Sequence, residues 1–119
     1  MDIEFIVEFY ESEAGTCPVR DFLDDLKTRD PDDFAAILAG LAKLRSRHYH
    51  REPLSKSVGD GLFELRHVGK LNTRVLWFFA KERRIVAVHC IRNKGRAIPR
   101  RDLQVARERM RDWRKRAKR

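Results

Sequence analysis

The chain has 119 residues, of which 42% are hydrophobic, enough for one domain with a real core and too few for two. Its net charge of +9, with 23 basic and 7 acidic residues in 45–119, favours a polyanionic partner such as nucleic acid, an anionic membrane surface or an acidic protein. Two isolated cysteines argue against a disulfide framework or a zinc-ligand series. The sequence has no long apolar stretch and no signal peptide, so a cytoplasmic protein is expected.

The first third of the chain predicts one strand and two helices. In residues 3–10 every second residue is apolar, which is typical of a half-buried strand, and only Ile6 breaks the pattern. Pro18 suits the first turn of a helix. Asp30 and Pro31 predict a second helix start, and this helix has an apolar stripe formed by Phe34, Ile37, Leu38, Leu41 and Leu44. The two helices are expected to form a hairpin that covers one face of a sheet.

The rest of the chain predicts a meander and a last helix. Residues 45–61 are polar and are predicted to be a loop or a frayed helix end. Residues 62–67, 74–79 and 85–91 are predicted strands, and their short links imply antiparallel pairing. Pro99 opens the last helix, whose packing stripe is Leu103, Ala106, Met110, Trp113 and Ala117. The fold class is therefore α+β: an N-terminal strand and a helical hairpin packed on a small, mainly antiparallel sheet, with a C-terminal helix, in one domain spanning 1–119.

Several short motifs resemble one protein superfamily. Residues 18–26 resemble the first-helix signature of the phage-derived HigB-like branch of the RelE/ParE toxins. Residues 53–66 are similar to that family's segment ending in Gly-Leu-Tyr-Glu-Leu-Arg, and residues 74–79 to its Arg-Val-Leu-Tyr-Phe strand. Residues 89–94 occupy the place of a His-x-Phe-x-Lys-Lys run, in which Asn93 replaces the first Lys. The order and spacing of these motifs carry the resemblance over nearly the whole chain.

The resemblance implies a RelE-like fold and the toxin of a type II toxin–antitoxin system. Such a toxin is a metal-independent, ribosome-dependent mRNA endoribonuclease that needs no cofactor and inhibits translation. The implied partners are the ribosome with its mRNA and a cognate helix-turn-helix antitoxin, whose complex with the toxin binds operator DNA. Cleavage by attack of the 2′-hydroxyl requires cations for the phosphate, a base and an acid.

Four residues are candidates for this chemistry. Arg66 is expected to contact the phosphate, and it shares a strand face with Glu64 by the period of two. The alternative role of Arg66 is a surface ion pair with Glu64 and no contact with RNA. Arg74 is expected to stabilise the transition state or to be a solvated strand end. Glu64 and His89 are the candidate proton-transfer groups, although a strand histidine is more often a hydrogen-bonded core residue. RNA-backbone contacts are expected from four basic residues: Lys70, Arg92, Lys94 and Arg96.

Several other interpretations of the sequence remain possible at this point. His48, His50 and His67 lack a carboxylate or thiolate partner for a metal site, so no metal is expected. Tyr49, Trp77 and Trp113 could stack on bases, but both tryptophans lie in core-like patterns. The basic C-terminal run could be a nucleic-acid surface, an antitoxin docking surface or a solvated end. Asn93 leaves room for a ParE-like toxin that poisons gyrase, and a non-catalytic basic nucleic-acid-binding module is the other alternative.

Overall fold

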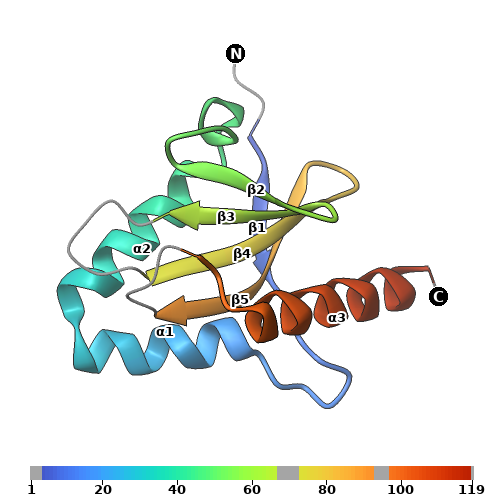
Figure 1. The fold of residues 1–119 in the computed structure, drawn as a ribbon, viewed down its shortest axis with the longest axis horizontal. Helices are drawn as coiled ribbons and strands as arrows, with labels where there is room; N and C mark the ends of the chain where they lie inside the picture. Colours follow the sequence, from blue (N-terminus) through green and yellow to red (C-terminus); the bar gives the residue numbers. More distant parts are fainter. Residues whose placement is uncertain (1–3, 67–72, 93–96, 119) are drawn as a thin grey trace.

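The computed structural model describes residues 4–66, 73–92 and 97–118. Its elements, in chain order, are β1 (Ile6–Phe9), α1 (Pro18–Arg29), α2 (Pro31–Lys43), the short 3₁₀ helix η1 (Arg47–Tyr49), β2 (Ser55–Gly59), β3 (Leu62–Arg66), β4 (Thr73–Ala80), β5 (Arg84–Arg92) and α3 (Arg100–Ala117). The strands form one sheet in the order β1-β5-β4-β3-β2 (Figure 1). β1 is parallel to β5, and the other pairs are antiparallel. The predicted α+β class with a mainly antiparallel sheet is confirmed.

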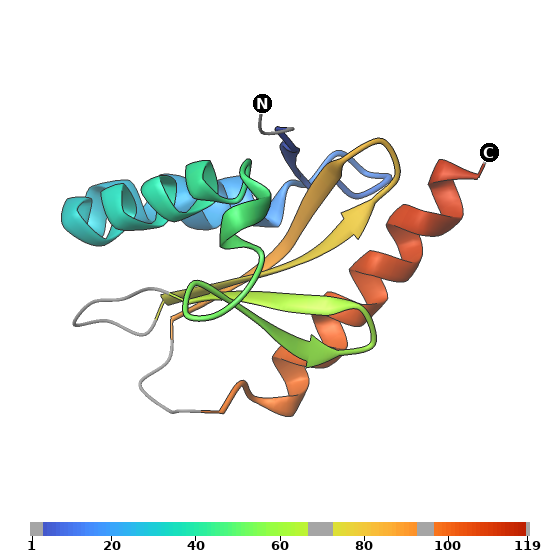
Figure 2. The same ribbon diagram turned by 90° about the horizontal axis from the view of Figure 1, so that it is seen from above.

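Helices cover both faces of this sheet, with α1 and α2 on one side and α3 on the other (Figure 2). The alternation of β4 explains both layers, because successive side chains of a strand point to opposite faces. Val75 and Trp77 belong to the core under the α1–α2 hairpin, whereas Leu76 and Phe78 belong to the core under α3. All four are fully buried. β4 is therefore buried on both faces, and it lies in the middle of the strand order. The run of aromatic and aliphatic residues over 74–79 predicts such a central strand.

The helix starts predicted from the sequence are confirmed for α1 and α2. Pro18 and Pro31 are the first residues of α1 and α2. The side chain of Asp30 accepts a hydrogen bond from the backbone N–H of Asp33 at 3.1 Å, which caps the start of α2. Within the described residues, no helix is long and apolar enough to cross a membrane.

The prediction for residues 45–61 is wrong in part, because this segment contains η1 and the strand β2. β2 lies at the edge of the sheet and exposes the polar residues Lys56 and Ser57. An edge strand of this kind forms through backbone pairing with its neighbour β3, so it has no apolar alternation that a sequence pattern could detect.

Three apolar assignments also differ from the prediction. The alternation over residues 3–10 places Tyr10 with Glu4 and Glu8 on the polar face of the first strand, but Tyr10 is 6% exposed. It belongs to the core under α3, and its hydroxyl donates to Asp112 of that helix at 2.6 Å. Leu38 is 43% exposed and lies outside the packed stripe of α2. Ala117 is exposed, so the apolar stripe of α3 continues beyond the part of the helix that packs on the sheet.

Candidate active site

The β3–β4 register brings three of the predicted residues together. Arg66 lies directly opposite Arg74, and Glu64 lies opposite Leu76. Because Leu76 belongs to the core under α3, these three charged side chains share the α3 face of the sheet. The predicted common face of Glu64 and Arg66 agrees with this arrangement.

Within this Glu64–Arg66–Arg74 cluster, one carboxylate holds two guanidinium groups. Glu64 Oε1 lies 3.3 Å from Arg66 Nε and 3.5 Å from Arg74 Nε. The side chains of Glu64 and Arg74 are 6% and 8% exposed, whereas that of Arg66 is 42% exposed. Arg74 is therefore a buried member of the cluster and not a solvated strand end. Arg66 is the member that a phosphate in solution could reach, and the two arginines leave the cluster with a net positive charge.

Sequence reasoning missed one basic residue beside this cluster. Lys56 lies opposite Glu64 in the β2–β3 register, so its side chain is on the same face of the sheet, and it is exposed. A lysine at this place can add positive charge for a polyanion. Recognising β2 as a strand paired with β3 would have placed Lys56 here.

His89 lies on the same face but is held by two hydrogen-bond partners. A bulge in the β4–β5 pairing places it opposite Leu76. Its Nδ1 is 3.0 Å from a terminal nitrogen of Arg109, and its Nε2 is 2.7 Å from Asp102 Oδ1. A guanidinium can only donate, so Nδ1 accepts and Nε2 carries the proton that it donates to Asp102.

This arrangement joins β5 to α3. The same Arg109 nitrogen donates to the carbonyl of Val88 at 2.8 Å, and burial lowers the pKa of Arg109 from its usual value. To transfer a proton to RNA, His89 would have to give up one of its two partners. The contacts therefore favour the hydrogen-bonded core reading of this histidine.

Of the four predicted RNA contacts, Arg92 is the one that lies within the described residues. Arg92 lies opposite Thr73 in the β4–β5 register, and its guanidinium donates to Asp30 Oδ2 at 2.7 Å. Asp30 is the residue between α1 and α2, so Arg92 is turned toward the helical hairpin and away from the Glu64–Arg66–Arg74 cluster. Lys70, Lys94 and Arg96 lie outside the described residues, as does His67.

Other candidate groups have structural environments. Trp77 is fully buried and stacks on Phe63 with ring centroids 4.8 Å apart. His50 Nε2 lies 2.6 Å from the Leu44 carbonyl oxygen. Burial raises the pKa of the Cys90 thiol from 9.0 to about 12, which makes it a poor nucleophile. Among the described residues, no group of three or more His, Cys, Asp or Glu side chains could hold a metal ion.

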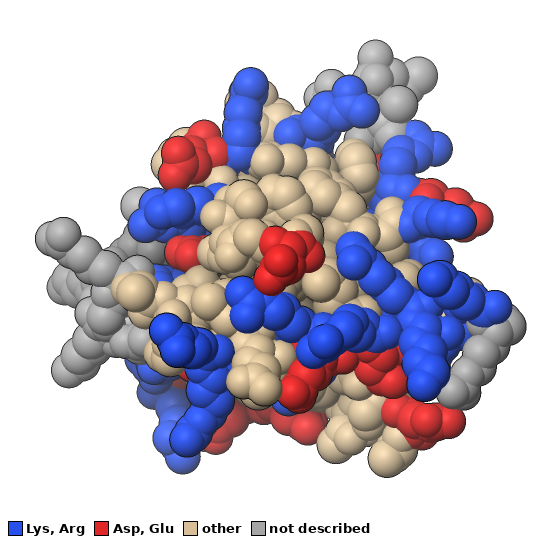
Figure 3. All heavy atoms as spheres, turned by 45° about the vertical axis from the view of Figure 1, so that its right-hand side comes forward, with Lys and Arg blue, Asp and Glu red and all other residues tan. Residues whose placement is uncertain are grey.

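Basic side chains gather on the side of the molecule that carries the C-terminal half of α3 (Figure 3). Exposed basic residues of this half and of the residue that caps it are Arg111, Arg114, Lys115 and Lys118. The uneven charge of the sequence is thus displayed as a positive surface, and this surface can attract a polyanion.

The fold and the cluster define a small α+β protein with a RelE-like arrangement of strands and helices. Residues 21–111 match the family model described as "Phage derived protein Gp49-like (DUF891)". This match covers most of the chain, which therefore belongs to the Gp49-like family, a family of RelE-toxin-like proteins. A search of curated proteins found no match.

Proposed function

We propose that this protein is the toxin of a type II toxin–antitoxin system and that it cuts mRNA in the translating ribosome, as expected for the HigB-like branch. The observation that carries the proposal is the Glu64–Arg66–Arg74 cluster, in which a buried carboxylate fixes one buried and one half-exposed guanidinium. Membership of the Gp49-like family supports the toxin class. The whole chain, 1–119, acts as one domain in this proposal.

The proposed reaction is a transesterification within the RNA strand. The 2′-hydroxyl attacks the adjacent phosphorus, the bond from phosphorus to the 5′ oxygen breaks, and the products are a 2′,3′-cyclic phosphate and a free 5′-hydroxyl. Arg66 contacts the non-bridging oxygens and offsets their growing negative charge. The buried guanidinium of Arg74 adds positive charge to the site, and its contact with the Glu64 carboxylate holds that carboxylate in position. No metal or cofactor takes part.

Two groups are proposed for proton transfer. Glu64 is the candidate base for the 2′ proton, because its carboxylate lies 3.3 Å from the proposed phosphate-binding residue Arg66. His89 is the candidate acid for the leaving oxygen, and this role requires that it releases Asp102 or Arg109 when RNA binds. Apo geometry of this kind does not exclude a catalytic group, since catalytic hydrogen bonds often form only with substrate.

The partners follow from the proposed class. The ribosome and its mRNA are the targets, which places the action in the cytoplasm. A helix-turn-helix antitoxin would hold the toxin inactive, and their complex would bind operator DNA. Lys70, Lys94 and Arg96 are proposed as RNA-backbone contacts. They belong to the two chain segments that follow Arg66 and Arg92. Arg92 is proposed with them, and to contact RNA its guanidinium would have to leave Asp30, which accepts a hydrogen bond from it.

The test is to induce the gene alone in cells and to map new 5′ ends on mRNA. In-frame cuts are expected with the wild type and with Arg29→Ala, a control in which an exposed arginine paired with Asp25 is removed. Arg66→Ala is expected to abolish the cuts, while a soluble protein with an unchanged circular dichroism spectrum shows that the fold is kept. Arg74→Lys, which keeps the buried positive charge, is expected to retain part of the activity.

Two other outcomes would contradict the proposal. Growth arrest without new 5′ ends would indicate a ParE-like gyrase poison. Neither arrest nor cuts would leave a non-catalytic basic nucleic-acid-binding module, and in that case several Lys and Arg substitutions should weaken RNA binding alike and reduce its salt dependence.

A further inference from the structure

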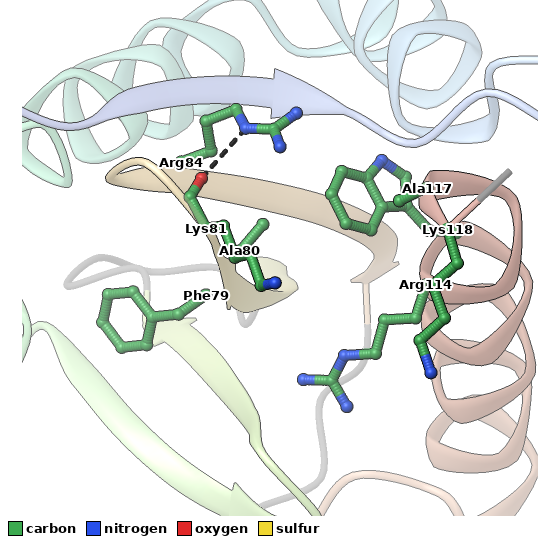
Figure 4. Close-up of a pocket in the computed structure, with 8 residues that line it drawn as sticks. Phe79, Ala80, Lys81, Arg84, Arg114, Ala117 and Lys118 are labelled. Carbon is green, nitrogen blue, oxygen red and sulfur yellow. Dashed lines mark hydrogen bonds between the residues drawn. The ribbon is translucent and has the colours of Figure 1, made fainter.

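A cleft of about 310 Å³ lies between the last turns of α3 and the hairpin that joins β4 to β5 (Figure 4). Its apolar part is formed by Phe79, Ala80, Trp113 and Ala117. Phe79 is 36% exposed and Ala117 is exposed, so apolar surface remains open to solvent here. The apolar stripe of α3 thus ends in the cleft and not on the sheet.

Basic side chains surround this apolar surface. Lys81 and Arg84 come from the hairpin, Arg114 comes from α3, and Lys118 directly follows that helix. Figure 4 shows the Arg114 guanidinium extending from the helix toward the hairpin. None of the described residues that line the cleft is acidic. One lining residue, Arg84, has a carboxylate partner, because Glu8 Oε1 lies 3.7 Å from its guanidinium.

We propose that this cleft binds an acidic segment of a protein partner through one bulky apolar side chain. The apolar side chain would occupy the space beside Trp113 and Ala117, and flanking carboxylates would pair with the four cations. An apolar pocket with a charged rim is the usual form of a peptide-anchoring site. A peptide suits the cleft better than RNA does, because the Arg84 guanidinium already lies 5.2 Å from the centre of the Trp113 ring and occupies a place where a base would stack.

The cleft is separate from the proposed active site. Arg74 and Ala80 lie near opposite ends of β4, and six residues of a strand span about 20 Å. The proposed peptide site therefore does not depend on the RNA chemistry, and the failure of one proposal leaves the other standing.

The test uses the purified full chain and two capped oligo-glutamate peptides, one with a central Leu and one with a central Ser. A Leu side chain gains by leaving water for an apolar pocket and a Ser side chain does not, so the Leu peptide should bind roughly tenfold more tightly or better. Fluorescence anisotropy of labelled peptides measures the affinity. Tryptophan emission locates the site, because Trp77 is fully buried and Trp113 lines the cleft. The emission change should disappear in Trp113→Phe.

A matched pair of double variants separates the cleft from the general positive charge. The Lys81→Glu and Lys118→Glu double variant reverses two charges at the cleft and should weaken Leu-peptide binding roughly tenfold. The Lys27→Glu and Lys43→Glu double variant changes the net charge equally, at exposed residues of α1 and α2, which cover the opposite face of the sheet and do not line the cleft. It should weaken binding by a factor of about three at most, since exposed distant charges are screened.

Three results would overturn the proposal. Equal weakening by both double variants would show attraction by net charge alone. Equal affinity for the Leu and Ser peptides would show that no apolar anchor is bound. Binding of a short single-stranded oligouridylate that competes with the peptide, and that is lost in the Lys81→Glu and Lys118→Glu variant, would make the cleft a nucleic-acid site.

Discussion

Replacing Glu64 by Gln is expected to lower the free energy of unfolding by about 3 kcal/mol. The Glu64 side chain is 6% exposed and contacts two guanidinium groups, of which that of Arg74 is 8% exposed. Removing one partner of a buried ion pair costs roughly 3 to 5 kcal/mol, because the remaining charge stays buried without full compensation. The lower end of this range applies, since glutamine keeps one oxygen that can accept a hydrogen bond.

Urea unfolding followed by circular dichroism measures this loss. With a slope of about 2 kcal/mol per molar urea for a domain of this size, the midpoint should fall by roughly 1.5 M. Glu4→Gln is the matched control, because Glu4 makes a shorter ion pair, 2.7 Å to Arg45, while both side chains are more than half exposed. Exposed pairs contribute about 0 to 1 kcal/mol, so the control midpoint should move by less than 0.5 M. Equal shifts in the two variants would refute the argument that burial makes the carboxylate of the cluster important.

Two further predictions concern His89 and the cysteines. His89→Leu is expected to lower the free energy of unfolding by about 2 kcal/mol, because two hydrogen bonds between β5 and α3 are lost. As the proposed acid, His89 should also matter for cleavage, so the folded variant should cut mRNA roughly 100-fold more slowly or worse. A loss of less than tenfold would leave His89 with a structural role only. In the folded protein at pH 8, a thiol reagent should modify the partly exposed Cys17 and leave the buried Cys90 unmodified until urea is added. The folded pKa of Cys90 is raised to about 12 from 9.0, so the folded state holds this proton longer than the unfolded chain does, and stability should fall from about pH 9 to pH 12 by up to about 1.4 kcal/mol per unit. Cys90→Ala should flatten this part of the curve of unfolding free energy against pH, and an unchanged slope would assign the loss to other groups.

Those elements that depend on local signals were predictable from the sequence. Pro18 and the Asp30–Pro31 pair determine where α1 and α2 begin, because proline position and side-chain capping act within one turn. The apolar run of β4 predicts a central strand, because a strand that is apolar on both faces must be covered on both faces. β2 could not be predicted, since its polar residues form a strand only against β3. The parallel pairing of β1 with β5 joins residues far apart in the chain, and no local pattern specifies it.

The candidate site was predictable to the extent that it depends on one strand. The period of two placed Glu64 and Arg66 on one face, and the structure agrees. Arg74 lies beside Glu64 and Arg66 because of the β3–β4 register. The sequence predicted that these two strands pair antiparallel, but it did not predict which residues face each other. The contacts of His89 with Asp102 and Arg109 depend on how α3 crosses the sheet. The position of a long helix across a sheet is a result of packing and has no signature in a short motif.

The proposed active site and the proposed peptide cleft should act independently, although α3 reaches both regions. Between Arg109, which contacts His89, and Trp113, which lines the cleft, α3 is anchored by Met110, which is 4% exposed. Substitutions more than 7 to 10 Å apart that share no partner usually have additive effects, and the two regions are about 20 Å apart along β4. The Lys81→Glu and Lys118→Glu variant should therefore cut mRNA as the wild type does, and Arg66→Ala should bind the Leu peptide with unchanged affinity. If occupying the cleft instead stopped cleavage, α3 would have to move as a whole, and the release of His89 by Arg109 would be the first contact in which to look for that movement.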